Sequence, residues 1–218
     1  MNEFIQFSVK ILPRLWEGMQ LTLALTATSA IFGTLMGLLI ALMRISKNRI
    51  LTAIAAGYVT LFRGTPLLLQ IVFFYMALPQ MGITLPAFPT AAIALSLNSG
   101  AYIGEIIRAG VQSIDKGQME AARSLGMSYG LAMRRVVVPQ TYRRLLPPMV
   151  NEFAALTKDT SLASAVSILE LMKISQQFVS STFKVAQTFV WTAVGYLIVT
   201  VALTSLAGYL EKKLEARE

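Results

Sequence analysis

Five charged or hydroxyl side chains interrupt an otherwise apolar stretch in the last third of the chain. They are Glu152, Lys158, Asp159, Thr160 and Ser161. A charge near the middle of a bilayer costs on the order of 3 kcal/mol, so such residues generally bind a solute, an ion or one another. Glu152 and Lys158 are six residues apart and fall on nearly opposite sides of a regular helix, so we expect that they do not pair directly.

The last three of these residues are types that begin helices. We therefore expect the helix to break near Thr157 and to restart at Ser161, which would leave a half-helix N-terminus that favours anions. A zwitterionic amino acid suits such a site. Its carboxylate would meet the half-helix N–H groups or Lys158, and its ammonium would meet Glu152 or Asp159.

Asn98 and Ser99 lie in a second apolar stretch, and both are neutral side chains that form hydrogen bonds. We expect them to complete the orientation of the solute. A structural role is the alternative: Lys158 and Asp159 would then pair with other protein groups, and Asn98 would join two helices. Both interpretations stay open at this point.

The composition is typical of a membrane protein. The chain has 218 residues, of which 55% are hydrophobic and 14% charged. Its net charge of +8 comes from bases that are not gathered on one helix or arm, which favours membrane lipids over nucleic acid as the partner. Histidine and cysteine are both missing, so we expect no catalytic residue, no metal site and no thiol chemistry.

Uncharged runs of about 20 residues are long enough to cross a membrane. We predict one domain, residues 1–218, that is an all-α integral membrane protein with five transmembrane helices. The spans are predicted at residues 18–43, 51–78, 90–107, 147–172 and 185–210. Residues 1–17 are typical of a helix at the membrane interface. Gly33 and Gly37, four residues apart, would let another helix approach the first span closely.

The motif Arg63-Gly64-Thr65-Pro66 predicts a kink within or at the mouth of the second span, because proline lacks a backbone donor and glycine weakens a helix. Arg63 itself is a base that can bind lipid phosphate, Glu105 or Glu120, but we favour a structural role for the motif. Glu105 and Arg108 are three residues apart and predict an ion pair at the end of the third span.

The distribution of basic residues predicts the orientation of the chain. With five spans, thirteen of the nineteen lysines and arginines fall on the side of the loop at residues 108–146, and four fall on the other side. Because cytoplasmic loops carry the excess of bases, we expect the N-terminus outside and the C-terminus in the cytoplasm.

Residues 120–139 of this loop form a basic segment with strong helix signals. Its defining residues are Glu120, Ala121, Ala122, Gly126 and Pro139. Gly126 can take the left-handed turn that ends a helix, and Ser128 suits the N-cap of a second short helix, which Pro139 would end. We predict two short helices that meet at a glycine corner, with Ala121, Ala122 and Leu125 on one face. An ordinary cytoplasmic hairpin is the alternative.

The spacing of this segment resembles the EAA loop of binding-protein-dependent ABC import permeases: Glu-Ala-Ala, three residues, Gly, nine residues, two aliphatic positions one residue apart, and Pro. In that family the loop is the coupling helix, which seats in a groove of the cytoplasmic ATPase. Four further stretches look like the polar amino-acid branch of the family. They are residues 63–66, 96–102, 151–153 and 158–162.

The resemblance implies a type I ABC importer permease in the inner membrane of a bacterium. Two permease subunits, identical or different, would surround a central path for an amino-acid substrate, with two ATPase subunits below and a substrate-binding protein outside. The chain has no Gly-x-x-x-x-Gly-Lys-Ser/Thr phosphate loop, so ATP and Mg²⁺ are expected on the separate ATPase. We therefore expect a transport subunit that is not an enzyme and binds no cofactor.

Three other functions remain open. An ion-coupled secondary transporter would use Glu152, Lys158 and Asp159 as a coupling site, but it leaves the EAA spacing unexplained. An intramembrane enzyme is disfavoured by the missing histidine and cysteine, and by the isolation of Ser181, whose Ser-x-x-Lys match we attribute to chance. A structural subunit without a solute path would require residues 152–161 to be sealed from water.

Overall fold

The computed structural model describes residues 2–215, and this part of the chain is helical, without a strand. The elements are α1 Asn2–Ile45, α2 Arg49–Gly64, α3 Leu67–Gln80, α4 Ala87–Gln112, α5 Lys116–Ser124, α6 Tyr129–Ala132, the π-helical turn η1 Met133–Val137, α7 Val138–Asp159, the 3₁₀ segment η2 Thr160–Val166, α8 Leu171–Thr182 and α9 Val185–Glu215. The predicted all-α class is confirmed.

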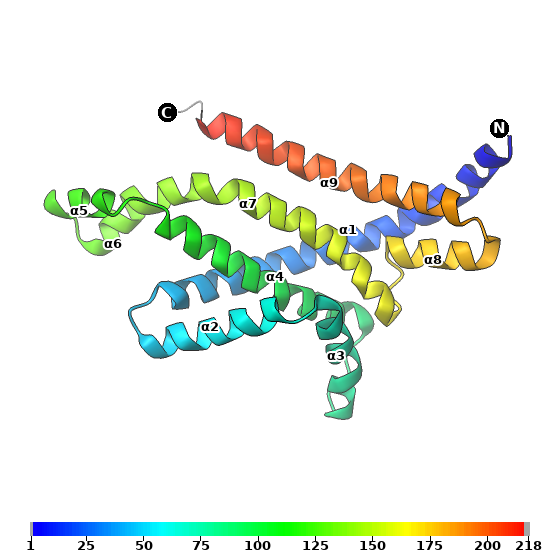
Figure 1. Cartoon of the computed structure of the whole chain (residues 1–218), viewed down its shortest axis with the longest axis horizontal. Helices are drawn as coiled ribbons and strands as arrows, with labels where there is room; N and C mark the ends of the chain where they lie inside the picture. The colour runs from blue at the N-terminus through cyan, green and yellow to red at the C-terminus, as the bar shows by residue number, and fades with distance from the viewer. Residues whose placement is uncertain (1, 216–218) are drawn as a thin grey trace.

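The long helices α1, α4, α7 and α9 run along the long axis of the molecule (Figure 1). The start of α1 and helix α8 lie at one end of this axis. Helices α5 and α6, the turn between α1 and α2, and the end of α9 lie at the other. The N-terminus and the basic loop are therefore at opposite ends of the molecule.

Close packing of α1 on α4 forms the centre of the fold, and glycine makes it possible. A Cβ atom added to Gly37 would lie 2.6 Å from Ile103 Cγ2, and one added to Gly33 would lie 3.3 Å from Ser96 O. Gly104 faces Ile40 in the same way from α4. The predicted role of Gly33 and Gly37 is confirmed, and α4 contributes small residues of its own.

Helix α1 is unbroken from Asn2 to Ile45, so the predicted separate interface helix before residue 18 is not formed. The reason is a stripe of apolar residues one turn apart. Phe7, Ile11 and Leu15 are buried against α8 and α9, in a cluster that includes Leu171 and Ile174. These side chains pack on protein, so the segment continues the first predicted span as one helix.

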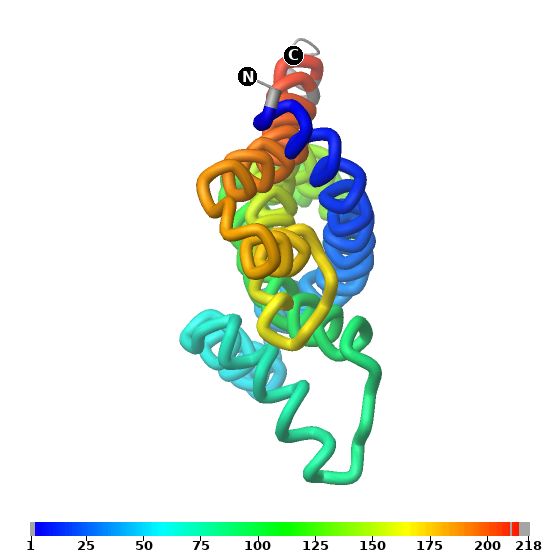
Figure 2. The backbone as a smooth tube through the Cα atoms, turned by 90° about the vertical axis from the view of Figure 1, so that its right-hand side faces the viewer, coloured from blue at the N-terminus to red at the C-terminus, as the bar shows by residue number. Residues whose placement is uncertain are grey.

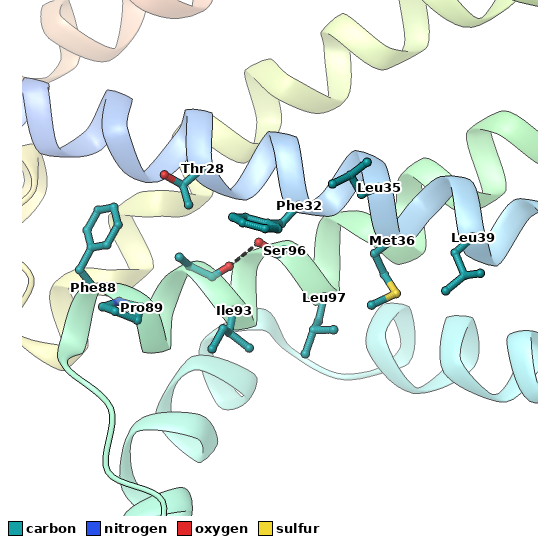
Figure 3. A pocket seen from close by; sticks show the side chains of 11 residues that line it. Thr28, Phe32, Leu35, Met36, Leu39, Phe88, Pro89, Ile93, Ser96 and Leu97 are labelled. Atoms are coloured by element: carbon teal, nitrogen blue, oxygen red, sulfur yellow. Dashed lines mark hydrogen bonds between the residues drawn. The ribbon is translucent and has the colours of Figure 1, made fainter.

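Helices α2 and α3 form the predicted kink, which is a corner of 100°. Helix α2 packs on α1 and α4 through Ala55 and Val59, whereas α3 packs on α4 and η2 through the buried Ile71, and its far end projects away from the long helices (Figure 2). An open apolar groove of about 580 Å³ lies between α1 and α4 (Figure 3). Phe32, Leu35 and Ile93 are among its lining residues.

Helix length and composition identify fewer spans than the sequence prediction. Within residues 2–215, α1 and α9 are long and apolar enough to cross a membrane, and α2 with α3 qualifies as one bent span. The segment predicted as the fourth span, residues 147–172, is not a single helix. It comprises the second half of α7, all of η2 and the start of α8.

Candidate solute pocket and coupling segment

A polar cavity of about 380 Å³ lies where the corner between α2 and α3 meets α4 and α7. Glu152, Ala155 and Asp159 face it from α7, because spacings of three and four residues place them on one side of the helix. Asn98 and Tyr102 line it from α4. The larger groove between α1 and α4 is apolar, so the smaller cavity is the better candidate for a polar solute.

Ser99 and Glu152 connect α4 to α7 at this cavity. The Ser99 hydroxyl is buried and donates a hydrogen bond of 2.9 Å to Glu152 Oε1. Asp159 and Arg63 both lie within electrostatic reach of Glu152. Within residues 2–215 neither Glu152 nor Asp159 forms an ion pair with a base. Two carboxylates therefore face the cavity without a direct cationic partner.

Asn98 has the structural role that the sequence left open as an alternative, because it joins two helices. Its amide donates to Phe62 O and to Gln70 Oε1, each at 3.0 Å. The Gln70 amide in turn donates to Phe62 O at 2.9 Å and to Thr65 O at 3.1 Å. Pro66 and the corner leave these carbonyls without helical partners, so the two amides replace the missing N–H groups. Asn98 lines the cavity and also joins two helices.

Gln70 is a functional residue that sequence reasoning missed. It is buried and supports the corner through three bonds, including 2.8 Å to Thr65 Oγ1. The signal was present: Gln70 is the one polar side chain among the aliphatic residues that follow Pro66. An amide four residues after a helix-breaking proline is well placed to cap the freed carbonyls.

Arg63 lies beside the cavity, with its guanidinium 4.8 Å from the centre of the Tyr102 ring. Glu105, one of its predicted alternatives, pairs instead with Arg44 at 3.1 Å and with Arg108 at 2.8 Å. The predicted Glu105–Arg108 pair is confirmed, and Arg44 extends it to α1.

The predicted break near Thr157 is wrong. Helix α7 continues to Asp159 and runs directly into η2, so Ser161 does not begin a half-helix with free N–H groups. The Thr157 and Thr160 hydroxyls bond back to the carbonyls of Phe153 and Thr157, at 2.9 and 2.8 Å, within the continuing turns. Thr160 is fully buried, and neither it nor Ser161 lines the cavity.

Lys158 also lies away from the cavity, because it is exposed on another side of α7 from Glu152. The structure therefore assembles Asn98, Ser99, Glu152 and Asp159, and it separates Lys158, Thr160 and Ser161 from them. The base beside this cavity is Arg63, which acts electrostatically on Glu152.

The actual break in this region lies between Ser167, whose φ is 62°, and the start of α8. Glu170 is fully buried and caps α8, accepting hydrogen bonds from Met172 N at 2.9 Å and Lys173 N at 2.7 Å. Tyr196 Oη donates a third bond of 2.8 Å. The helix N-terminus that could attract an anion is thus occupied by the chain's own carboxylate. Glu170, an acid within a predicted span, was overlooked in the sequence.

The Ser-x-x-Lys match has no catalytic geometry. Ser181 donates to Phe178 O, and Lys184 Nζ pairs with Glu3 at 2.7 Å.

The segment at residues 120–139 has the predicted glycine corner. Helix α5 ends in paired bonds from Gly126 N to Arg123 O at 3.0 Å and from Met127 N to Ala122 O at 3.2 Å. Gly126 has a φ of +82°, the left-handed conformation this ending requires. Ser128 caps α6 by accepting from Leu131 N at 3.3 Å, as predicted.

Two details of this segment differ from the prediction. Ala122 is buried, whereas Ala121 and Leu125 are exposed, so only part of the predicted face is open to another protein. Pro139 does not end the second helix: the helical backbone continues from α6 through η1 into α7. Pro139 stands at the start of α7, directly after the wider π-helical turn, where its missing N–H group is tolerated.

Residues 33–216 match the family model described as the binding-protein-dependent transport system inner membrane component. The chain is 36% identical over 219 residues to the arginine transport system permease protein ArtQ of Bacillus subtilis (strain 168), with 100% of both chains covered. It is 39% identical over 204 residues to the L-cystine transport system permease protein TcyB of the same organism, covering 93% of this chain and 87% of TcyB.

A solved structure described as an amino acid ABC transporter with histidines has the same fold. Its TM-score is 0.91 at 38% sequence identity, covering 96% of this chain and 98% of that one. The chain belongs to the family of inner membrane components of binding-protein-dependent transport systems, and it is a permease subunit separate from the ATPase.

Proposed function

We propose that this chain forms half of the membrane path of an ATP-driven importer of polar amino acids. The observation that carries the proposal is the cavity at the α2–α3 corner, where Glu152 and Asp159 form no ion pair with any base whose side chain the structure describes. An amino-acid ammonium would supply the missing charge. The names of the two relatives, for arginine and for L-cystine, support an amino acid as the solute class.

Within the site, Glu152 and Asp159 bind the solute, Ser99 orients Glu152, and Asn98 holds the wall of the cavity. This assignment follows the contacts of Ser99 and Asn98 and the position of the two carboxylates on α7. Lys158, Thr160 and Ser161, which were candidates from the sequence, are left out because they do not line the cavity.

The proposed orientation places the N-terminus outside and residues 108–146 and the C-terminus in the cytoplasm, with five passes through the inner membrane of a bacterium. Two observations support it. The excess of basic residues is on the side of that loop. The loop and the end of α9 also lie at the opposite end of the molecule from the N-terminus (Figure 1).

The proposed partners are a second permease subunit, two cytoplasmic ATPase subunits that bind ATP and Mg²⁺, and a binding protein outside. The proposed coupling surface comprises Glu120, Ala121 and Ala122 of α5, Gly126 at the glycine corner and Pro139 at the start of α7. Support comes from the exposure of Glu120, Ala121 and Leu125 at the end of the molecule, where another protein can reach them.

Uptake of a labelled amino acid into vesicles that hold the complete importer tests the proposal. Gly126→Val should leave the chain inserted but abolish ATP-dependent uptake, because valine strongly disfavours the φ of +82° that aims α5. Gly130→Val is the matched control, since Gly130 has neither a positive φ nor a neighbour within 4 Å of an added Cβ. Full ATP-dependent uptake by the Gly126 variant would contradict the coupling role, and uptake without the ATPase would favour a secondary transporter.

A further inference from the structure

An apolar groove and a basic turn lie next to each other along α1. The groove between α1 and α4 has a volume of about 580 Å³, within the range of roughly 300–1,000 Å³ that is typical of small-molecule sites. The turn between α1 and α2 carries two bases, Lys47 and Arg49. We propose that an anionic phospholipid binds here, with its phosphate at the turn and an acyl chain in the groove.

The surface of the groove suits hydrocarbon. Leu35 and Leu39 line it from α1, and Ile93 and Leu97 line it from α4 (Figure 3). Ser96, a polar residue of the lining, donates its hydroxyl to a carbonyl of its own helix, so it offers no free donor. The groove lies in the uncharged part of α1 that spans the hydrocarbon core. Water does not fill an apolar space there, so a lipid chain or another protein must fill it.

An exposed stripe of leucines connects the groove to the turn. Leu35, Leu39 and Leu42 are spaced by four and three residues, so they lie on one side of α1, and each is more than half exposed. At 1.5 Å per residue, Leu35 is about 15 Å from Ile45, the last residue of the helix. This length is half of the roughly 30 Å hydrocarbon core, which is the depth that the chains of one leaflet occupy. One lipid therefore reaches from the turn into the groove.

The turn is held in place by its own hydrogen bonds, which leave its bases free. Asn48 Oδ1 accepts a bond of 2.9 Å from the start of α2, and the Thr52 hydroxyl donates to Met43 O at 3.3 Å. Lys47 and Arg49, on either side of Asn48, are exposed. Neither forms an ion pair with any acid whose side chain the structure describes. A phosphate at the turn would therefore meet two available cations.

The charge at this end of α1 favours a lipid over a second permease subunit. Four bases, Arg44, Lys47, Arg49 and Arg108, are present with one acid, Glu105, which pairs with Arg44 and Arg108. Basic residues at the membrane surface attract anionic lipids. If two copies of the chain met through this face about an axis along the membrane normal, the same bases of both copies would lie at one depth and repel each other. The proposed orientation places this lipid in the cytoplasmic leaflet.

Quenching of tryptophan fluorescence by bromine-labelled lipids tests the inference. The full chain with Leu39→Trp as a reporter in the groove is reconstituted in bilayers, where bromine-labelled phosphatidylglycerol is compared with bromine-labelled phosphatidylcholine. The two native tryptophans, Trp16 and Trp191, line a different groove between α1 and α9, and the fluorescence of the unaltered chain is subtracted. Phosphatidylglycerol should bind at least about fivefold more tightly at the reporter, the scale of one base acting on an anionic lipid.

Two controls isolate the site. Lys47→Gln combined with Arg49→Gln should remove most of the preference for phosphatidylglycerol, whereas Lys10→Gln, which removes an exposed base near the opposite end of α1, should leave it unchanged. Leu197→Trp places a reporter on the exposed surface of α9, outside the groove, where the two lipids should quench equally. Leu35→Trp is a second reporter in the groove if Leu39→Trp does not fold.

The outcomes that would overturn the inference are specific. Equal quenching by the two lipids at Leu39→Trp or Leu35→Trp would do so, as would a preference that survives the loss of both bases. If neither lipid quenches the groove reporters while both quench Leu197→Trp, protein covers the groove and the inference fails. The proposed function is tested separately by ATP-dependent uptake, because lipid binding in this assay requires neither an amino acid nor ATP.

Discussion

Gly37 and Gly57 offer a direct test of whether α1 and α4 pack as closely as the structure shows. Both are glycines inside helices, so replacing either with alanine raises helix propensity equally, by about 1 kcal/mol. They differ in their surroundings. A Cβ atom at Gly57 would meet no atom within 4 Å, whereas one at Gly37 would lie 2.6 and 2.8 Å from two atoms of Ile103 and 3.0 Å from Gly104 N.

The contacts at Gly37 cannot be relieved cheaply. Ile103 is fully buried and β-branched, so its Cγ2 has little freedom to rotate away, and Gly104 N belongs to the backbone of α4. Overpacking of this kind costs about 1–3 kcal/mol. We therefore expect Gly37→Ala to be about 1–3 kcal/mol less stable than Gly57→Ala. For a chain of this size, each kcal/mol corresponds to roughly 2–4 °C in Tm.

Thermal unfolding of the two variants in detergent, followed by tryptophan fluorescence or size-exclusion chromatography, measures this difference. Gly57→Ala should unfold at or above the Tm of the unaltered protein, and Gly37→Ala below it. Equal shifts for the two variants would refute the close approach of α1 and α4 and, with it, the role assigned to the small residues between them.

Three further predictions concern the polar contacts that hold the helices together. Glu170→Ala should lower the free energy of unfolding by about 1–3 kcal/mol, because it removes the cap of α8 and the acceptor for Tyr196. Glu170→Gln should lower it less because glutamine keeps an acceptor, and equal losses in thermal unfolding would contradict this. Asn98→Ala should lower the free energy of unfolding by about 1–3 kcal/mol and speed proteolysis between α2 and α3. An unchanged rate of cleavage would argue against the support that Asn98 gives to the corner. Arg44→Ala should lower the free energy of unfolding by no more than about 1 kcal/mol, and Glu105→Gln should lower it more, because Glu105 pairs with both Arg44 and Arg108. The opposite order in thermal unfolding would contradict this arrangement of three charges.

The features that could be predicted from the sequence depend on local backbone chemistry. Pro66 and Gly64 identified the corner, Gly126 and Ser128 identified the end of α5 and the start of α6, and Gly37 identified a close helix contact. Each signal acts within a few residues, because a missing N–H group, a left-handed φ or an absent Cβ restricts the chain at that position.

The features that were missed depend on residues far apart in the chain. The helix after the break, α8, starts at Leu171 and not at Ser161. The Glu170 carboxylate at its start accepts hydrogen bonds from Tyr196 and from two backbone N–H groups, and Leu171 N donates to the Thr22 hydroxyl of α1 at 3.1 Å. Composition shows that residues 157–170 contain several capping residues, but not which of them has distant partners. The same holds for Asn98, whose structural role depends on Gln70.

The continuity of α1 has a mechanical consequence. At 1.5 Å per residue its 44 residues extend about 66 Å, roughly twice the 30 Å hydrocarbon core of a bilayer. This helix must therefore tilt steeply or project well beyond the lipid. Its first turns are packed against α8, and its last turn carries Arg44 in the ion pair with Glu105. The two ends of α1 are therefore connected by continuous helix without a loop between them, and Pro13, which lacks a backbone N–H group, is the position inside this helix where bending is expected.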